Sequence, residues 1–147
     1  MLRLEVTTLI NRPVQDVWDF FIDLTNSPNW TRSGSELRQT SAGPLGMGAT
    51  IESVRPMFGR EIKSQTIAVT QYEPGHRISI KAAVPLLGRV VQEITFETVG
   101  GGTRLSRKGE LELGRAEGLL GPILLRVLRS GWRTEMSNLK RLIEARP

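Results

Sequence analysis

Residues able to carry out acid–base or nucleophilic chemistry are few in this chain and are spread along it. The sequence has no cysteine and one histidine, His76, which excludes thiolate nucleophiles and leaves one imidazole for any zinc or Ser-His-Asp site. The other acid–base candidates are Glu61, Tyr72 and Arg107, and no two of the four stand at a diagnostic spacing. The sequence therefore offers candidate groups without a catalytic motif, and we expect neither a metal site nor a cofactor.

Gln92 and Arg107 are polar residues at positions that strand alternation assigns to an apolar face. Gln92 shares its parity with Ile94, and Arg107 shares its parity with Leu105 and Leu111. A buried arginine needs a partner, and a ligand oxygen or carboxylate would serve. The alternative is a sheet edge or bulge that turns Arg107 toward water. His76, in the turn "EPGH", is read as an exposed structural residue, with a gating or acid–base role as its alternative.

Composition narrows the class of protein. The chain has 147 residues, which fits one domain over residues 1–147, and its 39% hydrophobic residues with 15 Gly are typical of a globular protein. The net charge of +5 comes from 20 basic and 15 acidic residues, and aromatic residues are 5% of the chain. No basic block is interleaved with aromatic residues, so we do not expect nucleic-acid binding.

The elements that would hold these residues begin with a strand. Residues 2–7 alternate between apolar and polar types, where a signal peptide would have an unbroken apolar region. The longest apolar run, near "LLGPILL", is far shorter than the ~20 residues that cross a bilayer. These features predict a cytoplasmic protein.

Two short helices are predicted next, in "PVQDVWDFFIDLTNSPNW". Pro13 and Pro28 stand where helices begin. The first helix has one apolar stripe, and its members are Val14, Val17, Trp18, Phe21 and Leu24. We expect Trp18 and Phe21 to pack in the core and Trp30 to line the edge of a cavity.

Residues 34–113 follow a two-residue period, which predicts an antiparallel meander. Its strands are separated by turn sequences at 42–48, 58–60, 73–76, 85–88 and 100–102. "GPLGMG" within the first of these is read as a turn, because no helix follows to complete a phosphate-binding loop. Glu110 and Glu112 fall on the opposite parity from the apolar face and are expected in solvent.

A helix of about 25 residues is predicted at the end, with Pro122 in its first turn. Its inner stripe includes Trp132, either as core or as a ligand contact. "LLGPILLRVL" is apolar on more faces than a half-buried helix needs. It could pack a homodimer, or form a lid near a membrane with Arg126, Arg129 and Arg133 facing anionic headgroups, or be buried under the preceding loop.

This order predicts an α+β protein. We expect a helix-grip fold, in which a curved antiparallel sheet of six to seven strands wraps around a long C-terminal helix, with two short helices after the first strand.

The chain resembles the START/Bet v 1-like (SRPBCC) superfamily, in its polyketide cyclase/dehydrase or coenzyme Q-binding START-like branch. The resemblance covers essentially the whole chain, and it is carried by "INRPVQDVWDFFIDLTNSPNW", "GPLGMGATI", "IAVTQYEPGHRISI", "GGTRLSRKGELEL" and the closing helix. The pattern is specific for fold and nearly silent on activity, because this scaffold serves carriers, receptors, enzymes and co-chaperones.

The resemblance implies a cavity between the sheet and the last helix, and a single helix cannot fill the concavity of a wide curved sheet. The residues expected to line it are Trp30, Ile67, Ile80, Ala82, Gln92, Ile94, Phe96, Arg107, Leu124, Leu128, Trp132 and Met136.

Three functions follow from the sequence. The first is binding or carriage of a small hydrophobic or amphipathic molecule such as a lipid, an isoprenoid quinone or a polyketide-like aromatic. The second is a cyclase or dehydratase that uses Arg107, Tyr72, His76 or Glu61. The third is a co-chaperone-like interaction module that uses the outer face of the sheet. The protein is expected as a monomer or a homodimer, and a peripheral membrane contact is one alternative for the last helix.

Overall fold

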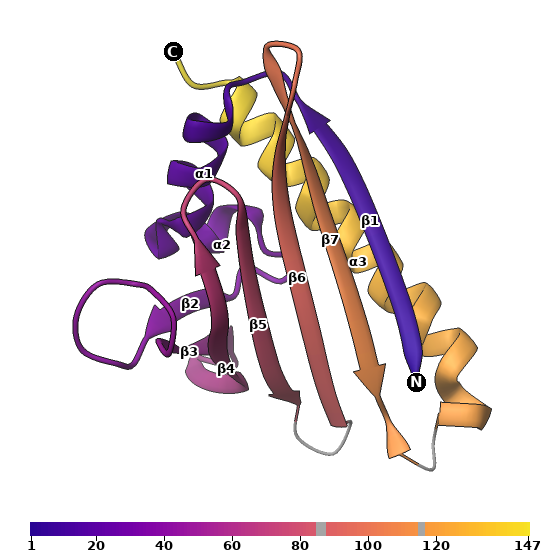
Figure 1. Ribbon diagram of the computed structural model, residues 1–147. Helices are drawn as coiled ribbons and strands as arrows, with labels where there is room; N and C mark the ends of the chain where they lie inside the picture. Colours follow the sequence, from indigo (N-terminus) through magenta and orange to yellow (C-terminus); the bar gives the residue numbers. More distant parts are fainter. Residues whose placement is uncertain (85–87, 115–116) are drawn as a thin grey trace.

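The structure is a computed structural model, and it describes residues 1–84, 88–114 and 117–147. Figure 1 shows a long helix lying along one face of a twisted sheet, with two short helices beside it. The elements in chain order are β1 (Leu2–Ile10), α1 (Val14–Ile22), a 3-10 turn (Leu24–Asn26), α2 (Ser27–Trp30), β2 (Glu36–Gln39), β3 (Thr50–Met57), β4 (Arg60–Glu73), β5 (Arg77–Val84), β6 (Gly88–Val99), β7 (Gly102–Glu112) and α3 (Glu117–Glu144). The predicted α+β helix-grip fold is confirmed.

The sheet is one antiparallel layer of seven strands in the order β1-β7-β6-β5-β4-β3-β2. Strands β3 to β7 follow each other as the predicted meander, and β1 pairs with β7, so that Leu4 is opposite Gly109. Bulges interrupt the register between β3 and β4 at Ser53/Val54, and between β4 and β5 at Val69/Gln71. Bulges increase local twist, which helps the sheet to curve toward the helices.

The predicted turns at 42–48, 58–60, 73–76 and 100–102 lie outside the strands or at their ends. The turn predicted at 85–88 falls mainly on residues 85–87, which lie outside the described residues. At the β3–β4 turn, Phe58 adopts a left-handed backbone with φ of 52° and its side chain is 96% exposed. A large aromatic residue rarely occupies this conformation.

The first short helix differs from its prediction at two apolar residues, Phe20 and Phe21. Val17 and Trp18 are buried as expected, but Phe20 is buried too, whereas Phe21 is half-buried. Phe20 lies outside the predicted stripe. It packs against the end of the chain, where the Arg146 guanidinium lies 4.6 Å from its ring centre. This contact joins positions far apart in the sequence, so local periodicity does not predict it.

Helix α3 begins earlier than predicted. It starts at Glu117, so Pro122 lies beyond the first turn rather than within it. The amino group of Met1 pairs with the Glu117 carboxylate and holds this end of the helix beside the start of β1. Along its length α3 packs chiefly on β1, and α1 and α2 lie against its second half (Figure 1).

The core lies between the inner, concave face of the sheet and the helices. Its sheet side is formed by alternate residues of neighbouring strands, including Ile94, Leu105 and Leu111, and its helix side includes Met136 and Leu139. Glu110 and Glu112 point to the outer face and are exposed, as expected from their parity. No helix in the described part of the chain is long and apolar enough to cross a membrane.

Candidate functional site

A polar cluster lies on the inner face of the sheet, under the second half of α3. The Arg107 side chain of β7 donates a hydrogen bond from Nε to Oε1 of Gln92 on β6, at 2.8 Å. Its Nη1 forms an ion pair with Oε1 of Glu135 on α3, at 2.7 Å. Arg107 therefore faces inward, and the alternative in which it turns to water is excluded.

This cluster is largely shielded from solvent. Gln92 is 6% exposed, and the side chains of Arg107 and Glu135 are 14% and 15% exposed. Trp132 covers the cluster, with its ring centre 4.1 Å from Arg107 Cζ, which is within the range of a cation–π contact. A shielded ion pair with a second hydrogen bond is strong enough to fix the position of the guanidinium.

Gly109 creates the space for the Trp132 ring. It is two residues from Arg107 on the inner face of β7, and a Cβ atom at this position would overlap Cη2 of Trp132. Only a residue without a side chain allows the edge of the ring to approach the strand this closely, so Gly109 also determines how the ring covers Arg107.

Glu135 also ties α3 to the segment that follows α2. Its Oε2 accepts a hydrogen bond from the backbone N–H of Arg32 at 3.0 Å. One turn later, the Asn138 amide donates to the backbone oxygen of Trp30 at 3.2 Å. Gly131 provides room for the Arg32 side chain, because a Cβ there would lie 2.8 Å from Arg32 Nη1. One carboxylate thus joins the helix, the sheet and this segment.

Aromatic side chains fill the space next to the polar cluster. Trp18 contacts Tyr72 and Phe96 edge to face, with ring centres 5.4 Å and 5.0 Å apart. Phe21 stacks on Trp30 at 5.6 Å. The indole N–H of Trp30 is buried without a hydrogen-bond partner among the described residues. An unsatisfied buried donor costs about 1–3 kcal/mol, so an acceptor placed there would be stabilising.

The other residues expected to line a cavity fall into two groups. Those packed fully in the core are Ile67, Ala82, Ile94, Phe96 and Met136. Those only half-buried are Ile80, Leu124 and Leu128. Val90, which was not among the predicted residues, is half-buried as well. The half-buried residues lie on the inner parity of β5 and β6 and on the first half of α3. Apolar surface of the interior is therefore accessible near the first half of that helix.

The four catalytic candidates are not brought together. Glu61 points to the outer face, where it pairs with Arg38 at 2.7 Å, and this ion pair lowers the pKa of its carboxyl group. His76 is exposed in the β4–β5 turn. Tyr72 lies on the inner face, and burial raises the pKa of its hydroxyl. Glu61 and Tyr72 are eleven positions apart on one strand, roughly 35 Å along it.

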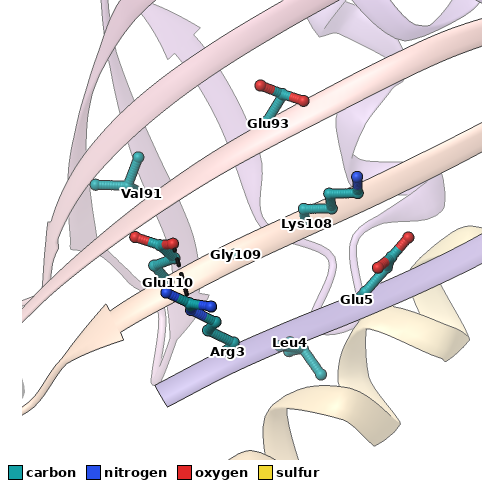
Figure 2. A pocket seen from close by; sticks show the side chains of 8 residues that line it. All are labelled: Arg3, Leu4, Glu5, Val91, Glu93, Lys108, Gly109 and Glu110. Atoms are coloured by element: carbon teal, nitrogen blue, oxygen red, sulfur yellow. Dashed lines mark ion pairs between the residues drawn. The ribbon is translucent and has the colours of Figure 1, made fainter. Parts of the chain in front are cut away.

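Two surface hollows stand out, and both lie on the outer face of the sheet. The larger has a volume of about 520 Å³ and is lined mainly by Arg3, Glu5, Glu93, Lys108 and Glu110, with Val91 (Figure 2). The smaller, of about 150 Å³, continues from it toward Met1 and Arg89. Arg3 and Glu110 pair across the larger hollow at 3.6 Å (Figure 2). A hydrophobic ligand there would desolvate several charges, so the inner face suits such a ligand better.

Two residues of the site were not identified from the sequence. Glu135 is the partner of Arg107, and its signal was its place one turn after Trp132 in a helix whose other acidic residues, Glu117 and Glu144, stand at its ends. Gly109 carried a weaker signal, as a glycine within a strand pattern. The sequence does not indicate the partner of Glu135 or of Gly109, because each contact joins positions distant in the sequence.

Comparison with known proteins identifies the fold and the family. No protein of curated function matches the sequence. A crystal structure of TTHA0849 from Thermus thermophilus has a TM-score of 0.76 at 15% identity, and the match covers 98% of each chain. Ara h 8.0201 has a TM-score of 0.78 at 8% identity, covering 99% of each chain. DynU16, from the dynemicin biosynthetic locus, has a TM-score of 0.70 at 20% identity, covering 97% of this chain and 47% of its own.

These identities are low, so the structural matches establish the fold alone, which is of the START/Bet v 1-like type. The sequence evidence is stronger for the family. The family model described as polyketide cyclase / dehydrase and lipid transport matches residues 1–144. A match of that extent means that the chain belongs to the polyketide cyclase / dehydrase and lipid transport family.

Proposed function

We propose that the protein binds a small amphipathic molecule between the inner face of the sheet and the first half of α3. The observation that carries the proposal is the polar cluster of Arg107, Gln92 and Glu135. It lies on the inner face of the sheet under the second half of α3, next to the apolar core. A ligand with an apolar body and one polar group matches this distribution. Lipids, isoprenoid quinones and polyketide-like aromatics all have that form.

The half-buried apolar residues support an entry route. Ile80, Val90 and Leu128 are partly solvent-accessible although they pack against the core, and Leu124 is half-buried in the same half of α3. Burial of their remaining surface by a ligand would contribute about 25 cal/mol for each Å² of apolar area. Under the second half of α3, the polar group of the ligand would accept a hydrogen bond from the Arg107 guanidinium or from the buried N–H of Trp30, which has no partner among the described residues.

A fluorescence titration with N-phenyl-1-naphthylamine, a neutral apolar probe, tests the location. We expect Ile80→Trp to weaken probe binding at least tenfold, because the larger side chain would occupy the proposed site. The matched control is Val91→Trp, which adds the same ring on the exposed outer face of the neighbouring strand. We expect this control to bind as the wild type does, with circular dichroism showing that both variants are folded.

Weaker binding by Val91→Trp and unchanged binding by Ile80→Trp would move the site to the outer hollow and contradict the proposal. The natural ligand can then be sought by native mass spectrometry of protein purified from its own host, followed by organic extraction.

The cyclase or dehydratase alternative gains no specific support. General acid–base catalysis requires groups within hydrogen-bond reach of one substrate. Glu61 is on the outer face and His76 is exposed in a turn, whereas Tyr72 and Arg107 share the inner face but are separated by β5 and β6. Arg107 is also held in an ion pair with Glu135, which suits it to binding a polar group.

A further inference from the structure

The first three turns of α3 expose an apolar surface that no described part of the chain covers. Leu119, Leu120, Ile123 and Val127 are 85%, 46%, 63% and 47% exposed. The sequence alternative of ordinary burial under the preceding loop is therefore wrong for these four side chains. Four large apolar residues on one helix form a patch rather than scattered exposure.

The patch is confined to one arc of the helix. At about 100° of rotation per residue, its four members fall within roughly 100° of each other, away from Gly121 and Trp132, which face the sheet. Farther along, the outer side of the same helix is polar and exposed at Ser130, Arg133, Thr134, Ser137 and Arg141. The apolar outer side is thus a local feature of the first half of α3.

Cations flank the patch. Arg126, Arg129 and Arg133 fall on the adjoining arc, and none of them forms an ion pair within the described residues. The acidic residues of the helix are engaged elsewhere, since Glu117 pairs with the chain amino terminus, Glu135 with Arg107 and Glu144 with Lys140. The surface is therefore apolar and positively charged.

We propose that this surface docks on a lipid bilayer that contains anionic headgroups. A helix with an apolar face beside arginines lies in the plane of the membrane interface, where acyl chains receive the apolar residues and headgroups receive the cations. A second copy of this chain fits less well, because it would bring the same unpaired arginines and no acidic surface on this face. The bilayer supplies an apolar interior for the leucine, isoleucine and valine side chains and anionic headgroups for the arginines.

The position of the patch adds to the argument. In this antiparallel sheet the β3–β4 turn, which contains the exposed Phe58, lies at the same end of the strands as the beginning of α3. The inward side of the same helix turns carries Leu125 and Leu128, which pack against the core. Docking would therefore place the proposed entry route next to the membrane, although docking itself requires no ligand.

Flotation with vesicles of phosphatidylcholine alone and with 30% phosphatidylglycerol tests the proposal. We expect partition into the anionic vesicles to exceed partition into the neutral ones about tenfold, and to fall in 0.5 M salt. Leu119→Ser/Ile123→Ser should reduce it about tenfold or more. The matched control, Leu9→Ser/Val99→Ser, removes two exposed apolar side chains at the opposite end of the sheet and should bind as the wild type does.

Absence of partition into anionic vesicles would overturn the proposal, as would equal loss in the control variant. If light scattering shows a dimer that Leu119→Ser/Ile123→Ser dissociates, without vesicle binding, the surface is a homodimer interface instead. The probe titration of the proposed ligand site is independent: a variant that no longer binds vesicles but still binds N-phenyl-1-naphthylamine separates the two sites.

Discussion

Arg107 is the residue that gives the interior of this protein its chemical character. Alternation in β7 assigned it to the apolar face, with a turn toward water at an edge or bulge as the alternative, and the structure places it inward with Glu135 as its partner. The partner could not be predicted, because strand and helix periods define faces but do not define which residue of a helix meets which residue of a sheet. Gln92 was predictable, since it lies on the same face of the adjacent strand.

A double-mutant cycle tests the energetic coupling of this pair. Arg107→Met and Glu135→Leu should each destabilise the protein, because each leaves a shielded charge without its partner, and the double variant should lose less than the sum. We expect a coupling free energy of about 1–3 kcal/mol from urea denaturation. Arg104 and Glu97, an exposed pair at 3.4 Å, should couple by less than about 0.5 kcal/mol. Equal coupling in the two pairs would contradict the account.

Tyr72 offers a pH test, because it is the one tyrosine of the chain. Burial raises the pKa of its hydroxyl, so the folded protein keeps the proton at pH values where the unfolded chain has lost it. Stability from this group is present below the ordinary pKa of about 10 and declines as pH rises beyond it. Absorbance at 295 nm should show a higher titration midpoint in folded than in urea-unfolded protein, and coincident midpoints would refute the prediction.

At the scale of elements, the strand, the two short helices, the meander and the long helix were all predictable. Period-two and period-3.6 patterns with prolines at helix starts identify them, and these patterns are local. The predictions were wrong where a contact between residues distant in the sequence accompanies the difference. Phe20 is buried by Arg146 at the other end of the chain, and α3 begins at Glu117, where the amino group of Met1 pairs with the helix.

The contact between α3 and β7 depends on Gly109. Gly109→Ala should destabilise the protein by about 1–3 kcal/mol, because the new methyl group overlaps the rigid Trp132 ring. Gly101→Ala is the control, since nothing lies within 4 Å of a Cβ atom there. Thermal denaturation measures both, and Trp132→Leu in the Gly109→Ala background should recover part of the loss. A Gly109→Ala variant as stable as the Gly101→Ala control would show that the ring is not held against the strand.

At the scale of the whole molecule, the fold separates two faces of one sheet. Strand parity predicted this separation, so the outer position of Glu110 and the inner position of Ile94 follow from the sequence. Helix α3 packs chiefly against β1, and Ile80 and Leu124 are half-buried. That packing is a property of the assembled sheet and helix and is not contained in any one segment.

The central claim is that an amphipathic ligand binds on the inner face beneath α3. The most direct measurement is a set of intermolecular nuclear Overhauser effects between N-phenyl-1-naphthylamine and protein methyl groups labelled at Ile, Leu and Val. The account predicts contacts from the probe to the methyl groups of Ile80, Val90 and Leu128, and none to Val91 in the outer hollow. Contacts to Val91 without contacts to Ile80 would contradict it.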